Sequence, residues 1–303
     1  MAPSTFRRSI RKMSSAFRSF KPLTMTSDNN SDAIIVLCVM HVQYLSAKLT
    51  RFSLNTLFVG KNFIELPRVA STNNFASELL VSKVPDGTVV FAVDQTAGKG
   101  QQGNTWHTQP GQNLTFSIIF YPEAFDARKV FVMNKMFSCA IFDFLESVIP
   151  EQELHIKWPN DLLVNRKKVA GMLIENHLSG GYVHTTVAGF GLNVNQLAFP
   201  VETYGPATSL AKATGKTFEL RPLLEKLLGK IESRYLMMRA GKMEHLERDY
   251  LRQLFGYQEK IQMEIEGEEK EVVIVGVDPA GRLAVQEGFK MNYYGIKEVK
   301  FCL

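Results

Sequence analysis

The chain has 303 residues, of which 45% are hydrophobic and 21% charged, a composition typical of globular proteins. Its formal net charge of +5 is concentrated at the start, where residues 1–27 carry six basic side chains and no acidic one. The rest of the chain is close to neutral, which argues against a nucleic-acid-binding fold. Cys38, Cys139 and Cys302 lie far apart, so they exclude a disulfide framework and indicate a reducing compartment.

The N-terminal part of the chain, residues 1–57, is interpreted as a basic extension. Residues 1–30 are rich in Ser and Arg and favour disorder. The same acid-free pattern fits an organellar transit peptide, and an extension without function is the alternative. The apolar run 33–42 is too short to span a bilayer. We expect a cytoplasmic protein, or one of an organellar matrix if residues 1–30 are a transit peptide.

Regular patterning begins at Phe58. A short strand is expected over 61–66, followed by a helix whose apolar face includes Phe75 and Leu79. Ser71 or Thr72 would cap this helix, whose free N–H groups could then bind an anion. A plain helix cap without a ligand is the alternative interpretation.

A glycine-rich loop, 98–103, follows a predicted β-branched strand over 88–94. The loop matches GxGxxG, but Pro110 and Gly111 and a second strand over 113–121 follow it in place of a helix. This order disfavours a dinucleotide-binding turn. Backbone N–H groups of such a loop can hold phosphate or carboxylate oxygens. A flexible polar hairpin is the alternative.

The middle of the chain combines a long helix, 126–149, with a polar hairpin. In this hairpin Lys157 and Lys168 flank a Trp-Pro-Asn-Asp segment. The tryptophans Trp106 and Trp158 both lie in polar loops, where each could be a stacking platform or a loop anchor. A strand over 169–176 and another over 182–195 follow, and Gly189 and Gly191 in the latter allow close approach of a ligand or chain. Helices are expected over 207–215, 219–240 and 242–254.

From Tyr257 the pattern changes to short alternating strands, which predict a small β-barrel or sheet. We therefore place a domain boundary near Gly256, between a domain over 58–255 and a C-terminal domain over 256–303.

Six segments together resemble biotin–protein ligases, and their order and spacing match as well. These segments are Ser71-Thr72-Asn73, Gln95 to Gly103, Trp106 with Pro110-Gly111-Asn113-Leu114, Lys157 to Asp161, Lys168 to Gly171 with Glu175, and Gly189 to Asn195. The resemblance runs from about residue 58 to the C-terminus and includes no helix-turn-helix domain. It indicates the monofunctional type, which does not bind DNA.

The resemblance implies an α+β fold of the class II synthetase-like biotin/lipoate ligase type. This fold has a mixed β-sheet with helices on one side and a small C-terminal SH3-like β-barrel. The implied reaction joins biotin and ATP into biotinyl-5′-AMP and pyrophosphate. A lysine of a biotin carboxyl carrier protein then accepts the biotin. Family members occur as monomers and homodimers, and no membrane is involved.

The resemblance also assigns roles to residues. Catalysis would use Lys168, Lys99 and Lys157, whose charges offset the repulsion between carboxylate and triphosphate. Asp161 is the expected carboxylate for Mg²⁺. The expected biotin contacts are Ser71, Thr72, Asn73, Gln95, Lys99, Gly100, Gln101, Lys168 and Gly171. The expected ATP or adenylate contacts are Gly98, Gln101, Trp106, Asn160, Asn193 and Asn195.

The glycine-rich loop departs from the family pattern, because Lys99 and Gln101 stand where arginines are usual. Lys keeps the charge but loses the bidentate fork, whereas Gln keeps hydrogen bonding and loses the charge. This altered loop motivates one alternative to a ligase, a biotin-binding module without ligase activity. Two further alternatives are a lipoate ligase or octanoyl transferase of the same superfamily, and a repressor that uses the adenylate as co-repressor. The neutral body of the chain argues against the repressor.

Overall fold

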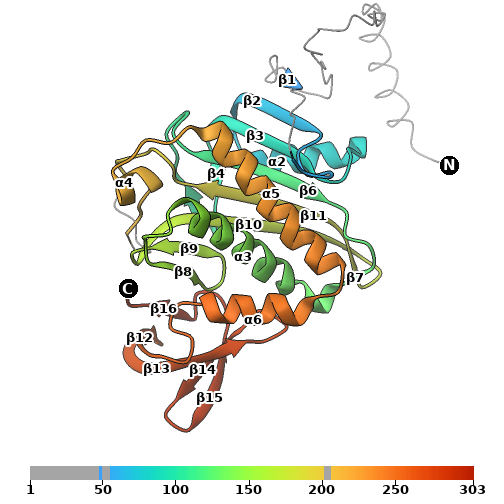
Figure 1. Ribbon diagram of the computed structural model, residues 1–303. Coiled ribbons are helices and arrows are strands. Elements are labelled where there is room, and N and C mark those ends of the chain that lie inside the picture. Colours follow the sequence, from blue (N-terminus) through green and yellow to red (C-terminus); the bar gives the residue numbers. More distant parts are fainter. Residues whose placement is uncertain (1–47, 50–54, 201–205) are drawn as a thin grey trace, which may run out of the picture. The chain divides into compact units, whose positions relative to one another are not determined.

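The computed structural model describes residues 48–49, 55–200 and 206–303 (Figure 1). Our predictions for residues 1–30 and for the run 33–42 lie outside these ranges. Among the described residues, Cys139 and Cys302 are free thiols, the first buried and the second exposed.

A mixed sheet of nine strands is the centre of the fold. Its order is β1-β2-β3-β6-β11-β10-β9-β8, with β7 paired to β11, and of these neighbours β2 and β3 alone are parallel. The strands are β1 (Lys48–Leu49), β2 (Phe63–Val69), β3 (Thr88–Gln95), β6 (Leu114–Phe120), β7 (Phe125–Asp126), β8 (Leu154–Lys157), β9 (Asp161–Val164), β10 (Lys167–Ser179) and β11 (Tyr182–Leu192). The expected mixed sheet is confirmed, although β2 begins and ends later than the predicted strand over 61–66.

Helices cover both faces of this sheet. On β3, Val89 and Phe91 belong to the large core under the long helices, whereas Val90 and Ala92 pack with the opposite helix, α2. This alternation has the period of two that a strand imposes on its side chains. The expectation of helices on one side is therefore wrong for α2. The helices are α2 (Thr72–Leu79), α3 (Phe131–Val148), α4 (Leu210–Thr214), α5 (Leu220–Arg239) and α6 (Met243–Gln253).

The predicted helices are confirmed with shifted ends. The helix expected over 126–149 is α3, and it is preceded by β7 and by the 3₁₀ turn η4 (Ala127–Lys129). The helix expected over 207–215 shrinks to α4, which begins after the N-cap Ser209 and ends at Gly215 in a left-handed conformation. A further 3₁₀ turn, η2 (Leu80–Ser82), continues α2.

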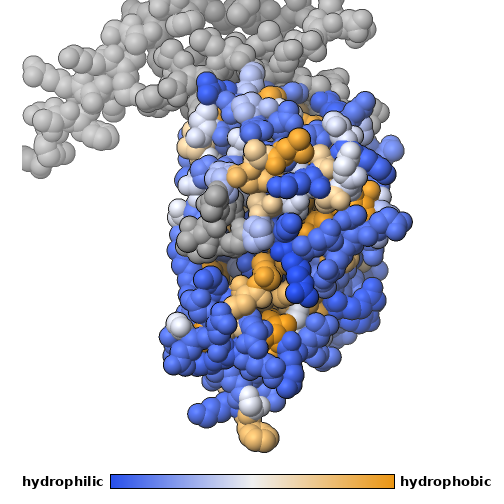
Figure 2. Space-filling model, turned by 90° about the vertical axis from the view of Figure 1, so that its left-hand side faces the viewer, coloured by the Kyte–Doolittle hydropathy of each residue, from blue (hydrophilic) through white to orange (hydrophobic). Residues whose placement is uncertain are grey.

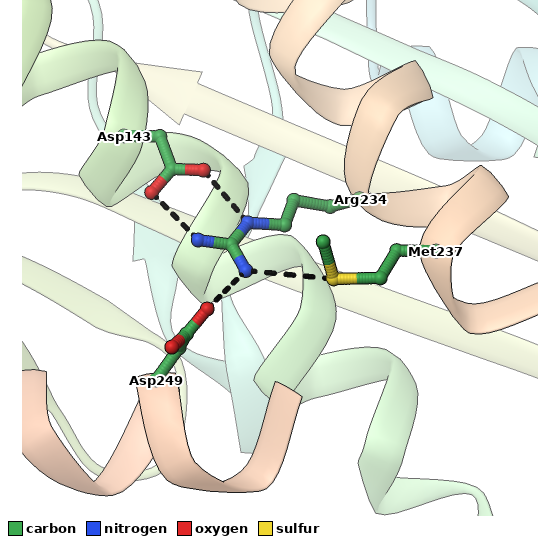
Figure 3. Close-up of polar contacts among 4 residues, drawn as sticks. All are labelled: Asp143, Arg234, Met237 and Asp249. Atoms are coloured by element: carbon green, nitrogen blue, oxygen red, sulfur yellow. Dashed lines mark hydrogen bonds and ion pairs between the residues drawn. The ribbon is translucent and has the colours of Figure 1, made fainter. Parts of the chain in front are cut away.

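One buried ion cluster joins three of these helices (Figure 3). Arg234 of α5 donates from Nε and Nη2 to both carboxylate oxygens of Asp143 on α3, at 2.7 and 2.9 Å. Its Nη1 donates to Asp249 of α6 at 2.6 Å. Removal of one member of such a cluster would leave its partners as unpaired, partly buried charges, which strongly destabilises a protein. The cluster therefore fixes how α3, α5 and α6 pack.

A second buried carboxylate binds the backbone just before the chain reaches β2. Glu232 of α5 accepts three successive backbone N–H groups, those of Leu57, Phe58 and Val59, at 2.7 to 2.9 Å. Upstream of this point, the backbone of β1 pairs antiparallel with β2. The ordered sheet thus extends into the segment we interpreted as an N-terminal extension.

The C-terminal residues form a separate five-stranded antiparallel sheet, as the alternating pattern predicts. Its strands are β12 (Lys260–Ile265), β13 (Glu268–Val277), β14 (Leu283–Glu287), β15 (Lys290–Tyr294) and β16 (Val299–Phe301). Lys135 of α3 binds this sheet to the helices: it donates to Glu247 of α6 at 2.5 Å and to the carbonyl of Val277 at 3.3 Å.

Hydrophilic residues dominate the face of the molecule shown in Figure 2, and hydrophobic ones gather in a central band. Within the described ranges, no helix has the length and hydropathy that a membrane span requires.

Candidate active site

A cavity of about 930 Å³ lies on the face of the sheet that carries α2. Besides the sheet, its walls come from the N-terminus of α2, the glycine-rich loop and the C-terminal sheet. It collects most of the residues that the sequence analysis assigned to a site. These are Ser71, Thr72, Asn73, Gln95, Lys99, Gly100, Gln101, Trp106, Lys157, Asn160, Asp161, Lys168 and Gly171.

Strand periodicity explains why this face is polar. On β11, Ala188, Phe190 and Leu192 belong to the large core, so the intervening Gly189 and Gly191 face the other way. A Cβ at Gly189 would lie 2.1 Å from Oδ1 of Asn73. A Cβ at Gly191 would lie 2.3 Å from Cε2 of Trp106. Both glycines are therefore required for close approach to the strand, as predicted.

The N-terminus of α2 is tied to the end of β3. Ser71 is the N-cap by its extended backbone, but its side chain makes no capping hydrogen bond. Instead the backbone N–H of Thr72 donates to Oε1 of Gln95 at 2.8 Å. One of the helix N–H groups expected to meet an anion is thus already satisfied, while the Ser71 side chain lines the cavity.

Asn73 is held by neighbours on two strands. Its Nδ2 donates to Glu175 at 2.8 Å and to the carbonyl of Leu173 at 3.2 Å, both on β10. Its Oδ1 accepts from Ser117 of β6, at 2.6 Å. Ser117 is fully buried and was not a predicted site residue, because one serine among the apolar residues of β6 gives no signal in the sequence.

The glycine-rich loop is a tight hairpin. Its strands β4 (Gly98–Lys99) and β5 (Thr105–Trp106) pair antiparallel, and a 3₁₀ turn, η3 (Gln101–Gly103), joins them. The N–H of Gly100 donates to the carbonyl of Asn104 at 2.7 Å. Because β3 precedes this hairpin and β6 follows it with no α-helix between them, the interpretation as a strand–loop–strand unit is confirmed.

The two tryptophans have different surroundings. Trp158 is buried, and its indole N–H donates to the carbonyl of Gly281 in the C-terminal sheet at 2.9 Å, so it is an anchor. Trp106 lies over Gly191 at the cavity wall, and its buried indole N–H has no acceptor among the described residues. Of the two, Trp106 is therefore the one placed to stack on a flat ligand.

Three predicted lysines converge on the cavity from separate strands. Lys168 forms an ion pair with Asp161 at 2.8 Å and lies 5.6 Å from the centre of the Trp106 ring. Lys99 donates to the side chain of Asn74 at 2.7 Å. The Nζ of Lys157 lies 5.5 Å from the centre of the Phe301 ring.

Burial lowers the pKa of Lys157, and the nearby charge of Lys168 lowers it further, whereas Asp161 opposes the shift. Its ammonium has no hydrogen-bond or ion-pair partner in the described part of the chain. A desolvated cation of this kind favours an incoming anion.

Three predicted nucleotide contacts do not line the cavity: Gly98, Asn193 and Asn195. Asn195 exchanges two hydrogen bonds with the backbone of Phe218, at 2.8 and 3.0 Å, so its side chain is fully used. Asn193 donates to the carbonyl of Thr208 at 3.0 Å, but its buried Oδ1 accepts nothing from the described residues. That unused acceptor is the remaining structural support for Asn193 as a nucleotide contact. Gly98 lacks room for a Cβ because Trp106 and Gln95 are too close.

The C-terminal sheet supplies cavity residues that sequence reasoning missed. They are Glu264, Ile296, Lys297, Val299, Lys300, Phe301 and Leu303. The cavity is thus lined by five lysines against two carboxylates, those of Asp161 and Glu264, which makes it electropositive. No cluster of three or more His, Cys, Asp or Glu side chains suitable for a metal occurs within the described ranges.

Residues 65–193 match the model of the biotin/lipoate A/B protein ligase family. These are the residues that form the sheet, the glycine-rich hairpin and most of the cavity. This part of the chain, somewhat under half of its length, is therefore similar to proteins of that family.

Individual relatives agree with this assignment. The bifunctional ligase/repressor BirA of Bacillus spizizenii is 35% identical over 193 residues, which cover 63% of this chain and 59% of that protein. The biotin--[acetyl-CoA-carboxylase] ligase of Mycobacterium tuberculosis is 28% identical over 236 residues, which cover 76% of this chain and 86% of that protein. The solved biotin protein ligase of Aquifex aeolicus in complex with biotin and ATP is similar with a TM-score of 0.65 and 26% identity, over 79% of this chain and 98% of that one.

Proposed function

We propose that the protein is an ATP-dependent biotin–protein ligase. It forms biotinyl-5′-AMP from biotin and ATP and then transfers biotin to a lysine of a biotin carboxyl carrier protein. One observation carries the proposal: a single cavity joins a neutral hydrogen-bonding wall at the start of α2 to a group of lysines. Biotin combines a neutral ring system with a carboxylate tail, and ATP adds a triphosphate, so both kinds of surroundings are needed in one place.

In the first step the biotin carboxylate attacks the α-phosphorus of ATP, and pyrophosphate leaves. The two reactants are anions that repel each other, so fixed positive charge must offset the repulsion as they meet. Lys157, Lys168 and Lys99 supply this charge from three different strands. Such catalysis consists of positioning and charge stabilisation, and it needs no nucleophile from the protein.

In the second step the amine of an acceptor lysine attacks the acyl carbon of the adenylate, and AMP leaves with the bonding electron pair. The acceptor must reach the cavity from outside, past the glycine-rich hairpin and the C-terminal sheet. The hairpin therefore has to hold the adenylate between the two steps and still admit the acceptor.

Mg²⁺ fits this site only as a companion of the nucleotide. Mg²⁺ is commonly bound through one or two carboxylates together with phosphate oxygens. Asp161 and Glu264 are the carboxylates that line the cavity. We infer that Asp161 would hold the ion beside the phosphates, where it adds to the charge supplied by the lysines.

Pyrophosphate release on adding biotin and ATP tests the proposal. We expect release with biotin, none without it, and transfer to a carrier domain that contains the acceptor lysine. The matched family also includes lipoate ligases, so lipoate and octanoate are the necessary competitors. Faster release with lipoate would favour the lipoate ligase, and biotin binding without release would indicate a non-catalytic binding module.

A further inference from the structure

The tip of the glycine-rich hairpin is held from the other end of the chain. Nζ of Lys297 donates to the backbone carbonyl of Gln102 at 3.0 Å. Lys297 lies in the turn between β15 and β16, and both residues line the cavity. The hydrogen bond therefore connects the C-terminal sheet with the loop that borders the ligand space.

The local backbone conformation positions both partners of this hydrogen bond. The turn at Lys297 is closed by the N–H of Glu298 donating to the carbonyl of Gly295 at 3.2 Å. The side chain of Glu298 accepts from the N–H of Gly295 at 2.5 Å. Lys297 has a φ of 74° and Gln102 a φ of 53°, so each adopts the left-handed conformation that non-glycine residues rarely take. Strained backbone of this kind persists where surrounding contacts require it.

The contact also places charge where the hairpin lacks it. Within the turn η3, Gln101 and Gln102 are neutral, and the nearest loop cation, Lys99, is turned toward Asn74. A cation at the hairpin tip is therefore supplied by the C-terminal sheet.

We propose that Lys297 is a positioning residue that latches the glycine-rich hairpin shut over the cavity. By doing so it governs how long the acyl-adenylate is retained. This second part rests on the proposed function. The latch itself does not depend on that function, since both partners of the hydrogen bond belong to this chain.

Amide hydrogen exchange of the ligand-free protein tests the latch directly. In Lys297→Met, we expect residues 98–106 to exchange about two- to five-fold faster, the effect of losing one exposed charge-assisted contact. Lys297→Arg should retain most of the protection. Lys290→Met is the matched control, because Lys290 is an exposed lysine of the same sheet that does not line the cavity. Unchanged exchange of the hairpin in Lys297→Met, with the global unfolding temperature equal to that of the control, would overturn the latch.

Retention is measured with labelled biotinyl-AMP bound to each protein and chased with unlabelled compound. Release from Lys297→Met should be faster by a similar factor, and Lys297→Arg should restore the slow rate. Equal release from wild type and Lys297→Met would overturn the role in retention. If the wild type binds no biotinyl-AMP at all, the proposed function fails, while the exchange experiment still decides the latch.

Discussion

Lys168→Ala should abolish most adenylate formation while leaving the fold intact. The side chain is 31% exposed and is paired with Asp161 at 2.8 Å, so its removal opens no core cavity. It does remove one of the three lysine charges we assign to the meeting of carboxylate and triphosphate. It also leaves the Asp161 carboxylate, 18% exposed, facing the incoming anions without its counter-ion.

The size of the effect follows from the loss of one preorganised charge. Removing a single group that stabilises developing negative charge typically lowers turnover about 10²–10³-fold, or about 2.7–4 kcal/mol. Binding of biotin alone should change far less, because we propose that its ring contacts the wall at the start of α2, away from Lys168. The measurement is the rate of pyrophosphate release at saturating biotin and ATP, with biotin affinity measured separately. Wild-type release by Lys168→Ala would refute the assignment.

A second substitution separates the two roles open to Asp161. If Asp161 serves only as the counter-ion, Lys168→Ala/Asp161→Asn should release pyrophosphate faster than Lys168→Ala, because the unpaired carboxylate is gone. If Asp161 also holds Mg²⁺, the double variant should be slower still and should need more Mg²⁺. The single variant Asp161→Asn then shows a raised Mg²⁺ requirement.

Four further substitutions test other parts of the structure. Gly191→Ala should displace the Trp106 ring, because its Cβ would lie 2.3 Å from the ring, and adenylate formation should fall by up to about 100-fold with the unfolding temperature little changed. Arg234→Met should reduce the free energy of unfolding by about 3 kcal/mol, since it leaves two half-buried carboxylates unpaired. Denaturant titration measures this free energy, and a loss no larger than that of an ordinary surface substitution would contradict the prediction. Gln101→Arg should add about 1 kcal/mol of charge-assisted bonding to the adenylate and label a bystander protein less at equal adenylate synthesis; equal labelling would count against it. Because the pKa of Lys157 is lowered, its charge is lost at a pH below the ordinary lysine pKa of about 10.4. Arg stays protonated at such pH values, so the alkaline decline of pyrophosphate release should move to higher pH in Lys157→Arg.

The elements of the fold could be predicted because their signals are local. The apolar, β-branched run of β3 and the helical spacing of apolar residues in α3 and α5 can each be read within a single element. The ends were less well placed: β7 and η4 occupy the beginning of the helix expected at 126. There Asp126 caps the turn through Arg128 N–H, a local choice that apolar periodicity cannot show.

The site was predictable in the parts that carry polar or glycine-rich motifs. Gly189, Gly191 and the Lys157–Asp161 segment stand out because polar and small residues interrupt apolar strands. The contributions of Lys297 and Phe301 could not be read in the same way, because their role depends on how the C-terminal sheet packs on the main one. That packing is made by contacts such as Trp158 with Gly281, which join residues far apart in sequence.

The glycine-rich hairpin carries few cations, and the lysines that other elements place around the cavity explain how the cavity can still bind anions. Four of the five lysines have partners among the described residues: Lys99 has Asn74, Lys168 has Asp161, Lys297 has the carbonyl of Gln102 and Lys300 has Glu264. For these four, an arriving phosphate only exchanges one acceptor for another.

Lys157 differs, because burial has removed much of its hydration and no described acceptor replaces the lost water. Its charge is costly in the resting protein and becomes favourable only when an anion enters. Only the part of this interaction that strengthens as charge develops in the transition state lowers the barrier, whereas the part already present with bound substrate lowers KM. Of the five lysines that line the cavity, Lys157 is therefore the one whose charge we expect to gain most when the reacting anions enter.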